Sequence, residues 1–142
     1  MAVKTAYPAE VLFKYGDYYK SLSAKLQTIK KGLGSNAIVD LIELTGRTQT
    51  DVAHILDLTE PTLRKYIRDG RELNTVLSEH ILQLFELFEK GIDTFGSLDE
   101  FKKWLPYHNI GINAKPIDLL DTLTGINIVM NELVRIDYGI LA

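Results

Sequence analysis

Four cationic side chains follow one another closely near the middle of the chain: Arg64, Lys65, Arg68 and Arg71. Guanidinium and ammonium groups gathered in this way contact phosphate oxygens, and such contacts position a protein on DNA. The surrounding residues 48–71 read as two short helices joined by a tight turn. This is the pattern of a helix-turn-helix, in which the first helix braces the second from behind while the second enters the major groove. We therefore predict that this segment reads DNA.

Local signals place the two helices and the turn between them. Thr48 and Thr59 are residues that cap helix N-termini, and Pro61 is sterically acceptable in the first turn of the second helix. Ala53 is small where the two helices must approach closely. Asp57 occupies the turn position where a left-handed backbone is usual, which aspartate tolerates better than most residues. The alternative for this segment is a three-helix core that never touches DNA, because such cores occur in other modules.

The segment resembles the phage-repressor (Xre-like) helix-turn-helix family over its whole length. The resemblance implies that the start and outer face of the second helix meet base edges, through Glu60, Pro61, Thr62 and Lys65. It also implies phosphate contacts from Gln49, Arg64, Arg68 and Arg71, and Thr59 at the helix start is included among the expected DNA-binding residues. Glu60 departs from the amide that is frequent in this family. A carboxylate can accept from the cytosine amino group, but it repels a nearby phosphate.

The composition is that of an ordinary soluble chain that can bury one good core or two small ones in 142 residues. It has no cysteines and no apolar run of membrane-spanning length, and we expect no secretory signal because its first residues lack the apolar h-region of a signal peptide. We therefore expect a cytoplasmic protein with no membrane partner. Residues 1–71 carry 11 Lys and Arg against 8 Asp and Glu, whereas residues 72–142 carry 5 against 11. The basic half can face phosphate, while the acidic half faces another partner or serves solubility.

Helical periodicity recurs along the chain and strand alternation is never sustained, so we predict an all-α fold. Residues 1–16 are expected to be irregular, and a helix is expected from Asp17 to Gly32. A long amphipathic helix is predicted from Leu73 to Gly91, a short one after Ser97, and a last one ending near Gly139. The expected domains are a helical extension (1–33), a helix-turn-helix domain (34–93) and a smaller C-terminal domain (94–142).

The C-terminal region carries a second motif, which includes Lys115-Pro-Ile-Asp-Leu-Leu120 and the terminal Arg135-Ile-Asp-Tyr-Gly139. It resembles the C-terminal toxin-binding domain of the Xre/MbcA/ParS-like antitoxins. The resemblance implies an antitoxin that covers the active site of a RES-domain toxin consuming NAD⁺, and that represses its own promoter through operator DNA. Reading paired half-sites needs two-fold symmetry, so we expect a homodimer, with a higher-order toxin–antitoxin complex. The long helix from Leu73 or the N-terminal tyrosines could supply the dimer surface.

The chain ends in apolar residues with no following element to cover them, which is typical of a binding surface. We predict toxin contacts from this end of the chain: Arg135, Tyr138, Gly139, Ile140, Leu141 and Ala142. Deleting residues 136–142 should then abolish neutralisation. The alternative is that the tail packs on the protein's own core. Asp118 and Asp121 lie near a predicted helix N-terminus, where they cap the helix or, alternatively, meet cations of the toxin; Asp118 is included in the expected toxin contacts.

No residue set suggests catalysis, a cofactor or a metal, so we predict that the chain is not an enzyme. Gly32-x-Gly34-x-x-Ala37 spells a dinucleotide fingerprint, but no strand precedes it, and its glycines are expected to end one helix and start another. His54, His80 and His108 are scattered and are expected at the surface or at edges. Two alternatives to the antitoxin remain: a transcriptional regulator whose C-terminal half senses a ligand or dimerises, and a small helical enzyme.

Overall fold

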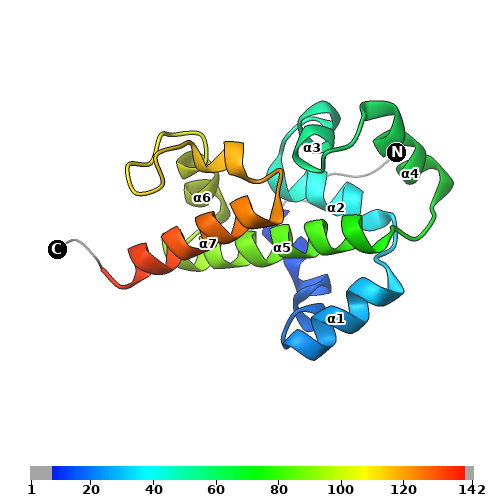
Figure 1. Ribbon diagram of the computed structural model, residues 1–142, viewed down its shortest axis with the longest axis horizontal. Helices are drawn as coiled ribbons and strands as arrows, with labels where there is room; N and C mark the ends of the chain where they lie inside the picture. The colour runs from blue at the N-terminus through cyan, green and yellow to red at the C-terminus, as the bar shows by residue number, and fades with distance from the viewer. Residues whose placement is uncertain (1–7, 140–142) are drawn as a thin grey trace. The chain divides into compact units, whose positions relative to one another are not determined.

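A computed structural model of the chain describes residues 8–139, and every named element in that range is helical (Figure 1). In chain order the elements are η1 (Pro8–Lys14), η2 (Gly16–Tyr18), α1 (Leu22–Lys31), α2 (Asn36–Thr45), α3 (Gln49–Ile55), α4 (Glu60–Asp69), α5 (Thr75–Phe95), α6 (Leu98–Trp104), η3 (Pro116–Leu119) and α7 (Leu123–Asp137). Over the same residues, strand-like pairing is confined to an isolated bridge between Asn109 and Ala114. The predicted all-α fold is confirmed. No helix in this range is both long and apolar enough to cross a bilayer.

The chain divides into two compact units, the first ending at Phe85 and the second beginning at Glu86, so the boundary falls inside α5. In the first unit, α3 packs on α4 and α2 contacts both. Leu41 of α2, Val52 of α3 and Leu63 of α4 are almost fully buried, and each such side chain contributes roughly 1.5–3 kcal/mol relative to exposure. The packing of α2 and α3 against the buried face of α4 therefore holds α4 in place.

The capping signals around α3 and α4 are confirmed. The hydroxyl of Thr48 accepts from the amide of Asp51 at 3.1 Å, and that of Thr59 accepts from the amide of Thr62 at 3.3 Å. Asp57 has the expected left-handed backbone, with φ of 55°. Each of these bonds satisfies an amide that the helix itself leaves unpaired, which fixes the residue at which α3 and α4 begin.

The N-terminal expectations need two corrections. Residues 8–14, expected to be irregular, form the 3-10 helix η1 and bury Val11 and Leu12. The helix expected from Asp17 begins only at Leu22, because Ser21 caps it by accepting from the amide of Ala24. Gly32 does end α1, donating its amide to the carbonyl of Thr28, as predicted.

Gly91 does not end α5, contrary to the prediction. The helix continues to Phe95, and Gly91 is buried where α5 packs against α6. A Cβ at residue 91 would lie 2.3 Å from the ring of Phe101, which also meets the ring of Phe88 edge-on. Gly91 is therefore a contact glycine inside a helix. Its role depends on a ring that comes from another element.

The second unit is completed by α6 and α7. Ser97 caps α6 by accepting from the amide of Glu100 at 3.1 Å, and Thr122 caps α7 by accepting from the amide of Gly125 at 2.9 Å. The ammonium group of Lys90 in α5 pairs with the carboxylate of Asp137 at the end of α7. This ion pair fixes the C-terminal turn of α7 to α5 within the unit.

Candidate functional site

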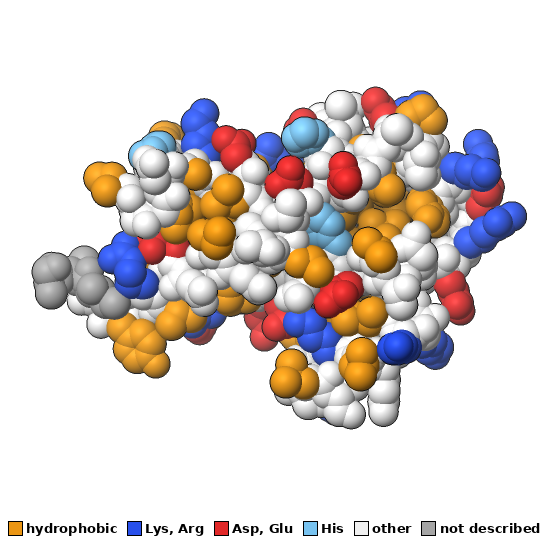
Figure 2. Space-filling view, viewed as in Figure 1, with side chains coloured by type: hydrophobic (Ala, Val, Ile, Leu, Met, Phe, Trp, Pro, Cys, Tyr) orange, Lys and Arg blue, Asp and Glu red, His pale blue; other side chains and the backbone are white. Residues whose placement is uncertain are grey.

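The helix α4 carries most of the predicted DNA-binding residues at its surface. The exposed ones are Gln49, Thr59, Pro61, Thr62, Arg64, Lys65, Arg68 and Arg71, and Glu60 is half-buried. Leu63 lies on the inner face of the same helix and is fully buried. Lys and Arg side chains stand out from the molecule over this part of the first unit in the space-filling view (Figure 2). The fold thus presents these side chains outward together, and their contacts with DNA stay predictions.

Ion pairs on α4 show how the unusual Glu60 is accommodated. Its carboxylate pairs with the guanidinium of Arg64, one helical turn on, at 2.9 Å. Arg68 pairs with the adjacent Asp69 at 3.2 Å. Within residues 8–139, Lys65 and Arg71 have no ion pair. Exposed pairs of this kind are weak, so both arginines can exchange their carboxylates for phosphates.

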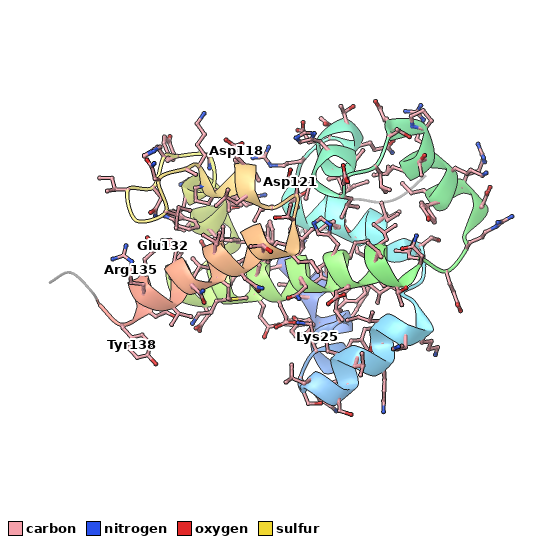
Figure 3. All side chains as sticks on the ribbon, in the orientation of Figure 1. Lys25, Asp118, Asp121, Glu132, Arg135 and Tyr138 are labelled. Atoms are coloured by element: carbon pink, nitrogen blue, oxygen red, sulfur yellow. The ribbon has the colours of Figure 1, made fainter. Side chains whose placement is uncertain are left out.

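The predicted toxin contacts lie at the C-terminal end of α7, in the second unit. The guanidinium of Arg135 donates to both carboxylate oxygens of Glu132, each at 2.7 Å, and the Glu132 side chain is only 4% exposed. Tyr138 is exposed, and Gly139 has a left-handed backbone with φ of 63°. Figure 3 shows Arg135 beside Glu132, with Tyr138 projecting elsewhere from the helix end. Ile140, Leu141 and Ala142 lie outside the described residues.

Glu132 is a residue that the sequence reasoning missed. The two hydrogen bonds from Arg135, helped by one from Asn109, lower the pKa of Glu132 even though burial acts in the opposite direction. The signal was present in the sequence, because residues three apart on a helix face each other. What the spacing could not reveal was the burial of the carboxylate, which links α7 to the loop that contains Asn109.

Substituting Glu132→Gln should lower the free energy of unfolding by about 1–2 kcal/mol at pH 7, because a neutral amide with one acceptor oxygen replaces the carboxylate that accepts two hydrogen bonds from the charged Arg135. A lowered folded-state pKa means that the pair stabilises the fold above the unfolded pKa of glutamate, about 4.3. That contribution is lost as the pH falls through the lower, folded-state pKa. Urea unfolding at pH 7 and in acid should therefore show the gap between wild type and variant closing in acid.

The matched control for this prediction is Glu100→Gln, which removes the exposed i,i+3 pair of Glu100 with Lys103 on α6. Its effect should be below about 0.5 kcal/mol at either pH. Equal effects of the two substitutions would contradict a structural role for the Glu132–Arg135 pair.

Asp118 and Asp121 are both exposed, and Figure 3 labels them near the start of α7. Asp118 lies in the first turn of η3, a single turn of 3-10 helix opened by Pro116. The side chain that caps α7 is that of Thr122, so the expected capping by Asp121 is wrong for this helix. A toxin contact from Asp118 stays a prediction.

One expectation about the three histidines is wrong. His80 is buried in α5 with 8% exposure, whereas His54 and His108 are exposed. His80 follows Leu77 by three residues and precedes Leu84 by four, so it occupies the apolar face of the helix. Among the described residues, no group of three or more His, Cys, Asp or Glu is arranged to hold a metal ion.

Comparisons with known proteins match both units. The family described as "Antitoxin Xre-like helix-turn-helix domain" matches residues 24–86, and the family described as "Antitoxin Xre/MbcA/ParS C-terminal toxin-binding domain" matches residues 90–139. A similar curated protein is the "Prs ADP-ribosylating antitoxin" of Sphingobium sp. (strain YBL2). It is 29% identical, over 92% of this chain and 89% of that protein. The chain therefore carries the two domains of an antitoxin of a toxin–antitoxin system, an Xre-like helix-turn-helix domain followed by an Xre/MbcA/ParS toxin-binding domain.

Proposed function

We propose that this antitoxin neutralises a RES-domain toxin that consumes NAD⁺ by covering its active site with the C-terminal domain, and that it represses its own operon by binding operator DNA. The observation that carries the proposal is the exposed end of α7: Tyr138 is 80% exposed and is followed by an exposed Gly139. An aromatic side chain left uncovered at a helix end suits insertion into a partner's cleft. The chain acts by binding alone, through this surface and through the cations of α4.

The expected use of NAD⁺ by the toxin has support from the comparison. The Sphingobium relative is described as a Prs ADP-ribosylating antitoxin, and ADP-ribosyl transfer takes its group from NAD⁺. A toxin paired with this chain would therefore bind NAD⁺, whether it transfers ADP-ribose to a protein or destroys the dinucleotide outright.

The experiment that tests the function is expression of the adjacent open reading frame in cells, with and without this antitoxin. Growth, cellular NAD⁺ and ADP-ribosylated proteins are followed together. Growth arrest with NAD⁺ loss or protein ADP-ribosylation, rescued by co-expression, is the expected result. A harmless neighbour, or arrest without either change, contradicts the proposal and favours a transcriptional regulator.

We expect the antitoxin to bind its operator as a homodimer, and the first unit exposes large apolar side chains that could contact a second copy. Phe13, Leu22 and Leu26 are 84%, 84% and 55% exposed, respectively. Tyr15 instead packs within its own chain, stacked on Phe85 and donating its hydroxyl to Asp40. We therefore assign the contact to the leucines of α1 and to Phe13, ahead of that tyrosine.

Substituting Leu22→Asp together with Leu26→Asp should convert the dimer into a monomer, because two carboxylates would have to be buried without partners. Light scattering coupled to size exclusion measures the change. Val76→Asp places a carboxylate on an exposed apolar site of α5, the long helix that is the alternative dimer surface, and it should leave the dimer intact. A dimer that survives the double substitution would place the contact elsewhere.

A further inference from the structure

The loop of residues 106–114, between α6 and η3, places large apolar side chains in solvent. Ile110 is 91% exposed and Tyr107 is 70% exposed. Figure 2 shows hydrophobic side chains at the surface over this part of the second unit. A single exposed apolar residue is ordinary, but an isoleucine with nearly its whole side chain in water gains nothing from the fold.

The 106–114 loop is nevertheless firmly held by its own backbone. Asn109 and Ala114 exchange amide–carbonyl bonds of 2.9 and 3.4 Å, and the amide of Asn113 donates to the carbonyl of Ile110 at 3.3 Å. The side-chain oxygen of Asn109 accepts from the amide of Ile112 at 3.2 Å. These bonds close a tight turn whose first residue is Ile110.

The Glu132–Arg135 ion pair of α7 supports the same turn, because the backbone of the turn lies directly against it. A Cβ at Gly111 would lie 2.8 Å from one carboxylate oxygen of Glu132 and 3.0 Å from the guanidinium of Arg135. The side-chain amide of Asn109 also donates to the carboxylate of Glu132. The backbone at Gly111 therefore rests on the ion pair, and Ile110 is presented from a fixed position.

A fixed loop with an exposed apolar side chain has the properties of a binding anchor, because little conformational entropy remains to be lost when a partner covers it. The loop adjoins Arg135, which is a predicted toxin contact, and it lies inside the matched toxin-binding domain of residues 90–139. We propose that the 106–114 loop is a second element of the toxin-binding surface, that Ile110 is its apolar anchor in a pocket of the toxin, and that Glu132 is the residue that positions it. This inference rests on the proposed function.

The test measures the affinity of the full-length antitoxin for the catalytically inactivated product of the adjacent open reading frame. Ile110→Asp should raise Kd by at least about 30-fold, mostly through faster dissociation, as for a central apolar anchor. Val76→Asp, which places the same charge on an exposed apolar site of the first unit, should leave Kd unchanged. Light scattering on both variants reports whether Ile110 instead serves contact between copies of this chain.

The positioning role is tested separately with Glu132→Gln. It should raise Kd by about 3- to 10-fold with Ile110 still present. It should also speed amide hydrogen exchange at Ile112 and Ala114, whose amides bond within the loop. Unchanged exchange at these two amides overturns the bracing role.

The outcomes separate the two levels of the proposal. If the wild type binds the inactivated toxin and Ile110→Asp binds equally well, the loop is not an anchor and the proposed function stands. A change in self-association without a change in toxin affinity overturns the inference in the same way. If the wild type does not bind this toxin, the proposed function itself fails.

Discussion

Truncating the chain after Asp137 is expected to abolish neutralisation of the toxin while leaving operator binding unchanged. Tyr138 is 80% exposed at the end of α7, so its removal takes no buried side chain from the second unit. Asp137 is kept because its carboxylate pairs with Lys90 of α5. The longer deletion of residues 136–142 would remove that ion pair and the half-buried Ile136, and would mix a binding defect with a folding defect.

The affinity of the truncated chain for the inactivated toxin should fall by at least about 100-fold, because a segment inserted in an active site concentrates binding energy in few residues. Full-length Tyr138→Ala separates the aromatic side chain from the residues that follow it. Thermal unfolding of each variant checks that α7 is intact. Normal neutralisation by the truncated chain would place the toxin contact elsewhere on the second unit.

The features that sequence reasoning predicted correctly are those that local bonds determine. Thr48, Thr59 and Ser97 each accept from an amide three residues on, so a few neighbouring residues contain the whole signal. Asp57 likewise needs only its own backbone conformation. The helix starts of α3, α4 and α6 could therefore be read without any tertiary knowledge.

The sequence reasoning failed where contacts with an element distant in the sequence determine the local structure. Gly91 looks like a helix stop, and only the ring of Phe101 makes it a contact glycine inside α5. The 106–114 loop was not an error, but the contact of Gly111 with Glu132 comes from another element and has no signal in the sequence of the loop itself. His80 is different: its place on the apolar face of α5 follows from the positions of Leu77 and Leu84, so its burial was predictable from the sequence.

The candidate DNA-binding residues fall between these cases. The spacing of Arg64, Lys65 and Arg68 placed them on one helix, and the structure adds that they are exposed and that Arg64 pairs with Glu60. Which of these side chains would contact a base and which a phosphate depends on how bound DNA would lie against α4. That division is open to measurement, because the two kinds of contact respond differently to salt and to sequence.

Removing Arg68 and Arg71 together is expected to weaken operator binding by a factor on the order of 10³ near 0.1 M salt, if about four phosphates per dimer are then no longer neutralised. Arg71 has no ion pair within residues 8–139, and the pair of Arg68 with Asp69 is exposed, so neither side chain is needed for the core. Binding of operator and of unrelated DNA should weaken about equally, because phosphates are the same in both.

The salt dependence identifies the cause of that weakening. With about four phosphates neutralised per subunit, the log-affinity of the wild-type dimer should fall against log salt with a slope near −7, and the double variant should give a slope near −4. Lys102→Ala with Lys103→Ala on α6 removes the same charge from the other unit and should leave the slope unchanged. A flat response of the wild type would rule out the DNA assignment.

Lys65→Ala should behave differently from the arginine pair, because removing a side chain that reads a base weakens operator binding more than binding to unrelated DNA.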